Sequence, residues 1–104
     1  MTWASWTTTG VFAGRGGVRT DDAGVLSGNL TVHTTWSGCE AQVAVQYTGG
    51  SDWFTVTGSP VRCVSEEGSR LLHQAVVDAV RAGGAATVPQ DIPAATWRDG
   101  AGPS

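Results

Sequence analysis

The chain has 104 residues and a mass of 10.7 kDa, which is enough for one compact domain and too little for two. Its net charge of −3 is too small for a disordered polyelectrolyte, and no apolar run approaches the ~18 residues of a membrane span. The six cations are all arginine and form no basic cluster, so we expect neither a nucleic-acid partner nor a membrane partner.

The sequence of the N-terminal part of the chain predicts strands joined by glycine-rich bends. Residues 2–12 are rich in threonine and aromatic side chains and predict a strand with Trp3 and Trp6 on opposite faces. Residues 14–17 predict a bend, because this run lacks the spacing of a phosphate-binding loop. Residues 18–20 then lead into a type I turn over 21–24.

The middle of the chain predicts two successive hairpins. Residues 25–36 and 41–48 alternate with period two, and a turn at 37–38, or a loop over 35–38, would join them. Either turn places Leu30 and Val32 beside Val43 and Val45.

The second hairpin turns at Gly49-Gly50. It pairs Val45 with Phe54 on one face and Gln46 with Trp53 on the other. Because the alternation of the two strands agrees at every cross-strand pair, the register is well specified.

A change of period after Pro60 predicts a helix over 65–83. Ser65 is the expected N-cap, acidic residues occupy the first turn, and a Gly-Gly pair ends the helix. The predicted apolar half of the helix contains Leu71, Leu72, Ala75, Val76, Ala79, Val80 and Ala82. His73 and Val77 fall on the polar half, with Val77 as an isolated apolar residue there.

These elements predict an α+β fold, in which a four- to five-stranded antiparallel sheet carries one long helix on one face. The predicted domain covers residues 1–88, and 89–104 form an extended Pro/Gly-rich tail. The helix covers the apolar face of the sheet. The other face is left for the tail around Trp97 or for a second subunit.

Chemistry-bearing motifs are missing from the sequence. The carboxylate pairs Asp21-Asp22 and Glu66-Glu67 are explained by a turn and by a helix dipole, and no nucleophile motif accompanies either histidine. The cysteines and histidines do not have metal-ligand spacing. We therefore expect no catalytic residue, no metal and no cofactor.

The first residues, Met1 to Trp6, lack the basic and apolar regions of a secretory signal, so we expect a cytoplasmic protein with reduced cysteines. The predicted register places Pro60 opposite Cys39. Cys63 would then lie three residues further along, or roughly 10 Å, beyond the ~7 Å between Cα atoms that a disulfide can bridge. The sequence thus predicts free thiols.

The uncovered face of the sheet supplies the candidate binding residues. They are Trp53, His33, Gln46, Gln42 and Thr55, accompanied by Thr31, Thr35 and Thr57. Such uncharged, β-prone side chains suit association between sheets or the stacking of a ligand. His33 is either a donor in an interface or a cross-strand partner of Gln42.

The order of three strands and a helix resembles the second half of a double-stranded-RNA-binding domain. Ser65-Glu66-Glu67 stands where that family has basic residues, which argues against RNA binding. Residues 36–40 and 80–83 also resemble a small family of uncharacterised actinobacterial domains, over less than half of the chain.

The sequence therefore favours a non-enzymatic protein-binding or assembly module that is homo-oligomeric through its uncharged Thr/Trp sheet face. The alternative is a small enzyme or ligand-binding domain with a pocket between helix and sheet, lined by Trp36, Cys39 and Tyr47. A further alternative is an immunity or inhibitor protein, since small acidic domains commonly serve that role.

Overall fold

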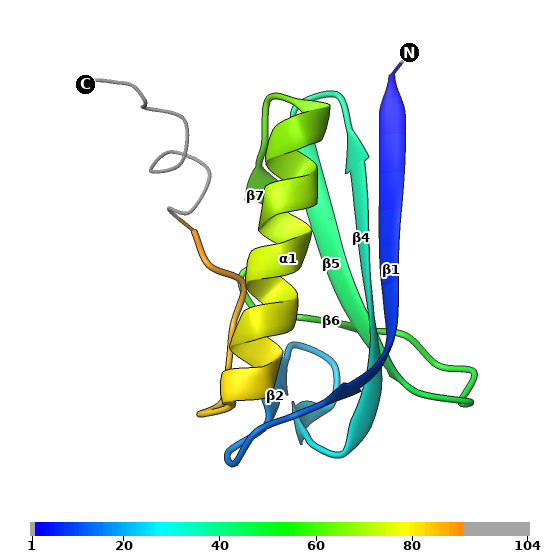
Figure 1. Cartoon of the computed structure of the whole chain (residues 1–104), viewed down its shortest axis with the longest axis vertical. Coiled ribbons are helices and arrows are strands. Elements are labelled where there is room, and N and C mark those ends of the chain that lie inside the picture. The colour runs from blue at the N-terminus through cyan, green and yellow to red at the C-terminus, as the bar shows by residue number, and fades with distance from the viewer. Residues whose placement is uncertain (1, 91–104) are drawn as a thin grey trace.

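A single helix lies across one face of an antiparallel sheet in the computed structural model, which describes residues 2–90 (Figure 1). The sheet has the strand order β1-β4-β5-β6, and β7 also pairs with β5. Its strands are β1 (Trp3–Phe12), β4 (Asn29–Ser37), β5 (Glu40–Tyr47), β6 (Phe54–Thr55) and β7 (Val61–Arg62). The helix is α1 (Glu66–Ala82). The predicted α+β class is confirmed.

Strands β2 (Val18–Thr20) and β3 (Gly24–Leu26) form a separate two-stranded sheet. The prediction of one continuous strand from residue 25 to 36 is therefore wrong. The chain breaks at Ser27-Gly28, where Gly28 has a φ of 103°, a conformation that side chains disfavour. This break turns β3 away from the main sheet to pair with β2.

The β4–β5 hairpin turns one residue later than the two-residue turn that the sequence suggests, which moves the partner of each β4 residue two positions along β5. Ser37 pairs with Glu40, so Gly38 and Cys39 form the turn, and Gly38 has the positive φ of 65° that its first position requires. The alternation is nevertheless preserved, because the shift is an even number of residues. Val32 lies opposite Val45 on the buried face, as predicted.

The β5–β6 register is confirmed where β6 exists, since Val45 pairs with Phe54. Beyond Val56 the chain leaves the ladder, and the Ser59 hydroxyl accepts a hydrogen bond from the Val43 amide at 2.9 Å. When the chain returns as β7, Ala41 lies opposite Val61, three residues later than the sequence register requires. The predicted pairing of Cys39 with Pro60 is therefore wrong.

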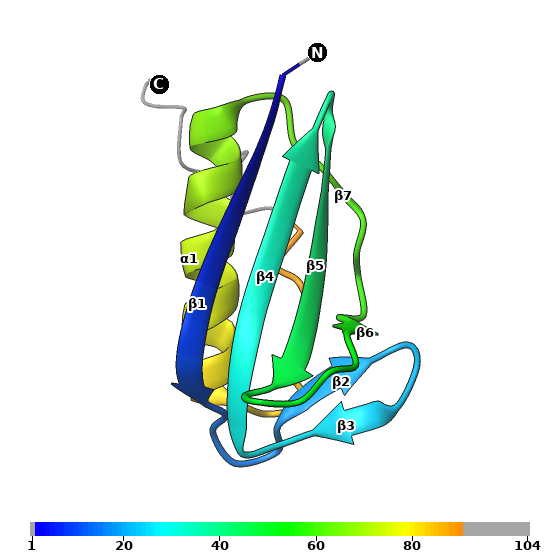
Figure 2. The same cartoon turned by 90° about the vertical axis from the view of Figure 1, so that its right-hand side faces the viewer.

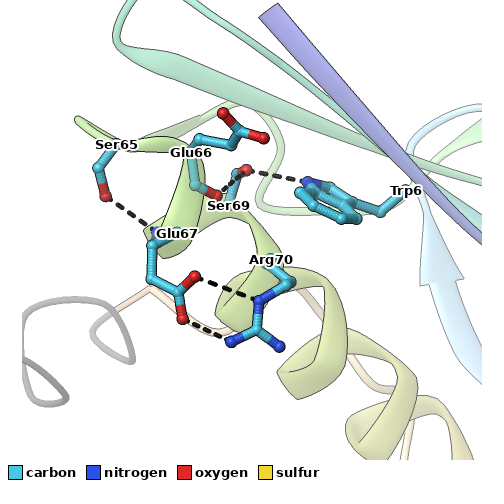
Figure 3. A network of polar contacts seen from close by, with 7 residues as sticks. Trp6, Ser65, Glu66, Glu67, Ser69 and Arg70 are labelled. Atoms are coloured by element: carbon cyan, nitrogen blue, oxygen red, sulfur yellow. Dashed lines mark hydrogen bonds and ion pairs between the residues drawn. The ribbon is translucent and has the colours of Figure 1, made fainter.

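Strand β1 forms the free edge of the sheet and pairs with β4 from Trp3 to Phe12, with a bulge between Thr8 and Val11. Trp3 lies opposite Ser37 and Trp6 opposite Thr34, so the two tryptophans point to opposite faces, as predicted. Trp6 faces α1, and its indole Nε1 donates to the Ser69 hydroxyl at 2.9 Å (Figure 3).

The helix begins and ends at the residues that the sequence indicates. Ser65 is the N-cap, and its hydroxyl accepts a hydrogen bond from the Gly68 amide at 2.9 Å (Figure 3). Glu67 and Arg70 form an exposed ion pair on the first turn. At the other end, the Gly83 amide donates to Ala79 and Val80.

The buried stripe of α1 is rotated from the predicted one. It consists of Gly68, Ser69, Leu72, His73, Val76, Val77 and Val80. The placement of His73 and Val77 on the solvated side is therefore wrong. Val77 contributes more apolar area than an alanine such as Ala75, and the sheet hydroxyls that face His73 allow its polar ring to be buried.

The core lies between α1 and the sheet, and it extends to the β2–β3 sheet and to the segment that follows α1. It includes Val11, Leu30, Val32, Val43, Val45, Val56, Leu72, Val76, Val80 and Val88, all 0–1 % exposed. The 14–17 bend packs on the end of α1, and a Cβ atom at Gly14 would lie 2.3 Å from the Arg81 carbonyl oxygen. Only glycine fits there. Within residues 2–90, no helix is long and apolar enough to cross a membrane.

Candidate functional site

The candidate site is the sheet face turned away from α1, which we call the open face (Figure 2). Strand alternation places on it Trp3, Ser5 and Thr7 from β1, Thr31, His33 and Thr35 from β4, Gln42, Ala44 and Gln46 from β5, and Thr55 from β6. The centre of this set is uncharged, and Glu40 and Arg62 lie opposite each other at one end. Figure 2 shows that the described chain places no second layer over it.

An aromatic and polar cluster orders the middle of the open face. The Thr7 hydroxyl and His33 Nδ1 are hydrogen-bonded at 2.7 Å. The Trp53 ring lies 5.6 Å from the His33 ring, centroid to centroid, at a tilt of 52°. Trp53 is still 46 % exposed, so it is held in place without being covered by the described residues.

The five candidate residues all belong to the open face. His33 lies opposite Ala44, so its expected pairing with Gln42 is wrong, because the hairpin turns later. Gln42 lies opposite Thr35 and Gln46 opposite Thr31.

Thr55 lies opposite Ala44 at the β6 edge of the face, and its amide donates to Asp22 Oδ2 at 2.7 Å. The hydroxyl of Thr57 donates to Asp21 Oδ1 at 2.9 Å. The carboxylate pair Asp21-Asp22 therefore connects the β2–β3 turn to the chain around β6. These two carboxylates therefore have a structural role.

A shallow hollow lies at the Glu40 end of the open face. It has a volume of about 180 Å³ and is lined by Thr35, Ser37, Glu40 and Gln42. Pockets for drug-sized ligands run to about 300–1,000 Å³ and are mostly apolar. The hollow is smaller and more polar, so it fits part of a larger contact better than it fits a small-molecule pocket.

The pocket proposed between helix and sheet does not form from its three expected residues. Trp36 is buried, and its Nε1 donates to the Cys63 carbonyl at 2.8 Å. Tyr47 lies opposite Leu30 at the far end of β5 and is 45 % exposed. Cys39 is exposed in the β4–β5 turn. The register separates Trp36 from Tyr47 by about 20 Å.

A second polar cluster, missed by the sequence analysis, lies between the sheet and α1. His73 Nε2 is 2.8 Å from the Thr8 hydroxyl, and its Nδ1 is 2.8 Å from the buried Thr34 hydroxyl. Burial lowers the pKa of His73, with a smaller contribution from the charge of His33. Both ring nitrogens are engaged, so this neutral histidine is a structural group.

The β1 residues of the open face were also missed, because the partner of the N-terminal strand could not be assigned. The alternation of Trp3, Ser5 and Thr7 was the available signal. The predicted tail falls mostly outside the described residues, which end at Gln90, and so does Trp97. Within the described part of the chain, no cluster of three or more His, Cys, Asp or Glu side chains could hold a metal ion.

Compared with known proteins, the chain matches no family model, no curated protein and no solved structure at a significant level. Function must therefore be argued from the open face itself.

Proposed function

We propose that the protein is a non-catalytic assembly module whose copies associate through the open face. The observation that carries this proposal is the half-exposed Trp53, held against His33 in the middle of an uncharged sheet face. Tryptophan at the centre of an interface often dominates the binding energy, especially when it is already ordered in the free protein.

The surroundings of Trp53 support contact with another protein surface. Threonine side chains lose less conformational entropy on ordering than lysine, and neither threonine nor glutamine carries a charge that must be desolvated. Charged residues are depleted at interface cores in the same way. A second copy fits best, because two such faces can meet across a two-fold axis without a charge mismatch.

Trp53→Ala tests the proposal. The wild type should associate in a concentration-dependent way, and Trp53→Ala should weaken the association by about 30-fold or more, equivalent to roughly 2 kcal/mol. Multi-angle light scattering and sedimentation equilibrium measure both. Tyr47→Ala is the matched control, because Tyr47 is equally exposed but belongs to the other side of the strand alternation.

A wild-type chain that stays monomeric at millimolar concentration would refute self-association. Equal weakening by Tyr47→Ala would also contradict it, since the effect would then not depend on the open face. The alternative cover for Trp53 is the tail. If cutting a monomeric protein after Val88 were to speed hydrogen exchange at the indole N–H of Trp53, the tail would take the place of the second copy.

A further inference from the structure

The two cysteines, which the sequence analysis placed too far apart to interact, are neighbours across the β5–β7 ladder. Glu40 pairs with Arg62 and Ala41 with Val61, so Cys39 and Cys63 occupy the next opposed positions. A backbone hydrogen bond from the Cys63 amide to the Cys39 carbonyl, at 2.8 Å, continues the ladder to this pair.

The spacing of such a pair suits a disulfide. Directly opposed residues of an antiparallel ladder that share a hydrogen bond have Cα atoms about 5.5 Å apart. Disulfides span about 4.4–6.8 Å between Cα atoms. The register that would have kept the thiols apart is wrong, and so the distance argument against a bridge no longer holds.

Strand alternation also indicates the side to which the Cys63 side chain points. Ala41 and Val61 are buried toward α1, whereas Glu40 and Arg62 are exposed on the opposite side. Cys63, the next residue, is buried toward α1 again, where a Cβ atom at Gly68 would lie 3.4 Å from its Sγ, and Cys39 lies opposite it in the turn. Both thiols are free in the structure, with Cys39 exposed in the turn and Cys63 buried.

We propose that Cys39 and Cys63 are an oxidative modification site, at which an intramolecular disulfide fastens the β4–β5 turn to the segment that enters α1. The inference rests on the ladder and on the two thiols, and it is independent of the proposed self-association.

The difference in exposure gives the two thiols separate roles. Burial raises the pKa of Cys63, whose Sγ lies 3.4 Å from the Ser65 carbonyl oxygen, so this thiol is the less reactive of the two toward solvent reagents. Cys39 is the accessible point of attack.

With a low-molecular-weight disulfide as oxidant, the Cys39 thiolate attacks one sulfur of that disulfide and releases one thiolate. The Cys63 thiolate then attacks the Cys39 sulfur of the mixed disulfide and releases the second thiolate. The two protein protons end on the two released thiols. The protein loses two hydrogens, and the oxidant is reduced to two thiols.

The disulfide should stabilise the fold, because it closes the loop between residues 39 and 63 in the unfolded chain. We expect the thermal midpoint of the oxidised protein to rise by roughly 10 °C relative to the reduced protein.

The experiment compares the full chain after incubation with glutathione disulfide and after incubation with dithiothreitol. Intact mass under non-reducing conditions, thiol titration and thermal unfolding are measured on each sample. The expected product is a chain two hydrogens lighter, with no free thiol, no glutathione adduct and a higher midpoint.

The matched control is the double variant Cys39→Ser/Ser37→Cys, which keeps two thiols but moves the exposed one to the open-face side of the hairpin. It should retain a glutathione adduct and gain no stability. Both of its substitutions are at exposed positions, so it should fold.

A persistent glutathione adduct on the wild type, a disulfide between two chains through Cys39, or thiols that do not react would each overturn the proposal. Ring closure that lowers the midpoint would also overturn it, because the native geometry would then not accommodate the bridge. Equal ring closure in the control variant would show that the opposed register is not what brings the thiols together.

Discussion

At the scale of single residues, the buried histidine of α1 makes stability depend on pH. His73 has both ring nitrogens hydrogen-bonded to threonine hydroxyls, and burial lowers its pKa. The groups that face it are the hydroxyls of Thr8 and Thr34, and the smaller contribution to its lowered pKa comes from His33.

The direction of the pH effect follows from the lowered pKa. The unfolded chain binds the His73 proton with an ordinary pKa near ~6.5, more tightly than the folded chain does, so protonation favours unfolding. The contribution of neutral His73 is complete above that value and is lost progressively as the pH falls through it toward the lower pKa of the folded state.

We therefore expect the thermal midpoint of the wild type to fall between about pH 7.5 and pH 5. In His73→Gln this fall should be much smaller, although the variant is less stable overall. His33→Gln is the comparison variant and should reduce the dependence only slightly, because burial lowers the pKa of His73 more than His33 does. Calorimetry at matched ionic strength measures the midpoints, and an unchanged slope in His73→Gln would contradict the assignment.

At the scale of elements, the sequence determined which segments form helix and strands better than which side of the helix is buried. Ser65, the acidic first turn and the Gly-Gly end are local signals, and they located α1 correctly. The burial of His73 depends on Thr8 and Thr34, which come from strands far away in the sequence. A helical wheel counts a histidine as polar and has no knowledge of such partners.

For the candidate site, the sequence predicted which residues share the open face but not which residues are neighbours across the strands. The five candidate residues share one face because strand alternation survives a two-residue shift of the cross-strand pairing. The cross-strand partner of His33 and the neighbourhood of the two cysteines were not predictable. The partner of His33 depends on the residue at which the β4–β5 turn begins. The cysteine pair depends on where the chain leaves β5 and returns as β7, and the sequence does not show that the Ser59 hydroxyl takes the place of a backbone partner there.

The rotated helix gives a discriminating prediction. Val77→Asp and Val76→Asp should both prevent folding, because each places an unpaired charge in a core where the valines are 1–2 % exposed. Gln74→Ala, on the exposed side, should change the free energy of unfolding by no more than about 0.5 kcal/mol. Circular dichroism during thermal unfolding measures all three. A stable, helical Val77→Asp would favour the orientation predicted from sequence.

At the scale of the whole molecule, the chain after α1 connects parts that the main sheet leaves separate. Ala86 forms a parallel bridge with Val18 of the small β2–β3 sheet, and its carbonyl accepts the Arg19 amide at 2.9 Å. The Thr57 amide in turn donates to the Arg19 carbonyl at 3.0 Å. These backbone hydrogen bonds thus join three segments that are distant in sequence: β2, the chain around Thr57 and the chain after α1.

Val88 is the buried apolar side chain that packs the segment after α1 against the rest of the domain. It is 1 % exposed, and its amide donates to the Thr57 carbonyl at 2.9 Å. Val88→Ala removes two buried methyl groups without removing the backbone bond, so we expect the free energy of unfolding to fall by about 2 kcal/mol. Thr87→Ala, at the exposed neighbouring position, should change it by less than about 0.5 kcal/mol. Urea unfolding followed by tryptophan fluorescence measures both variants. If Val88→Ala were as stable as Thr87→Ala, the segment after α1 would contribute nothing to the fold, and the domain would end with the helix.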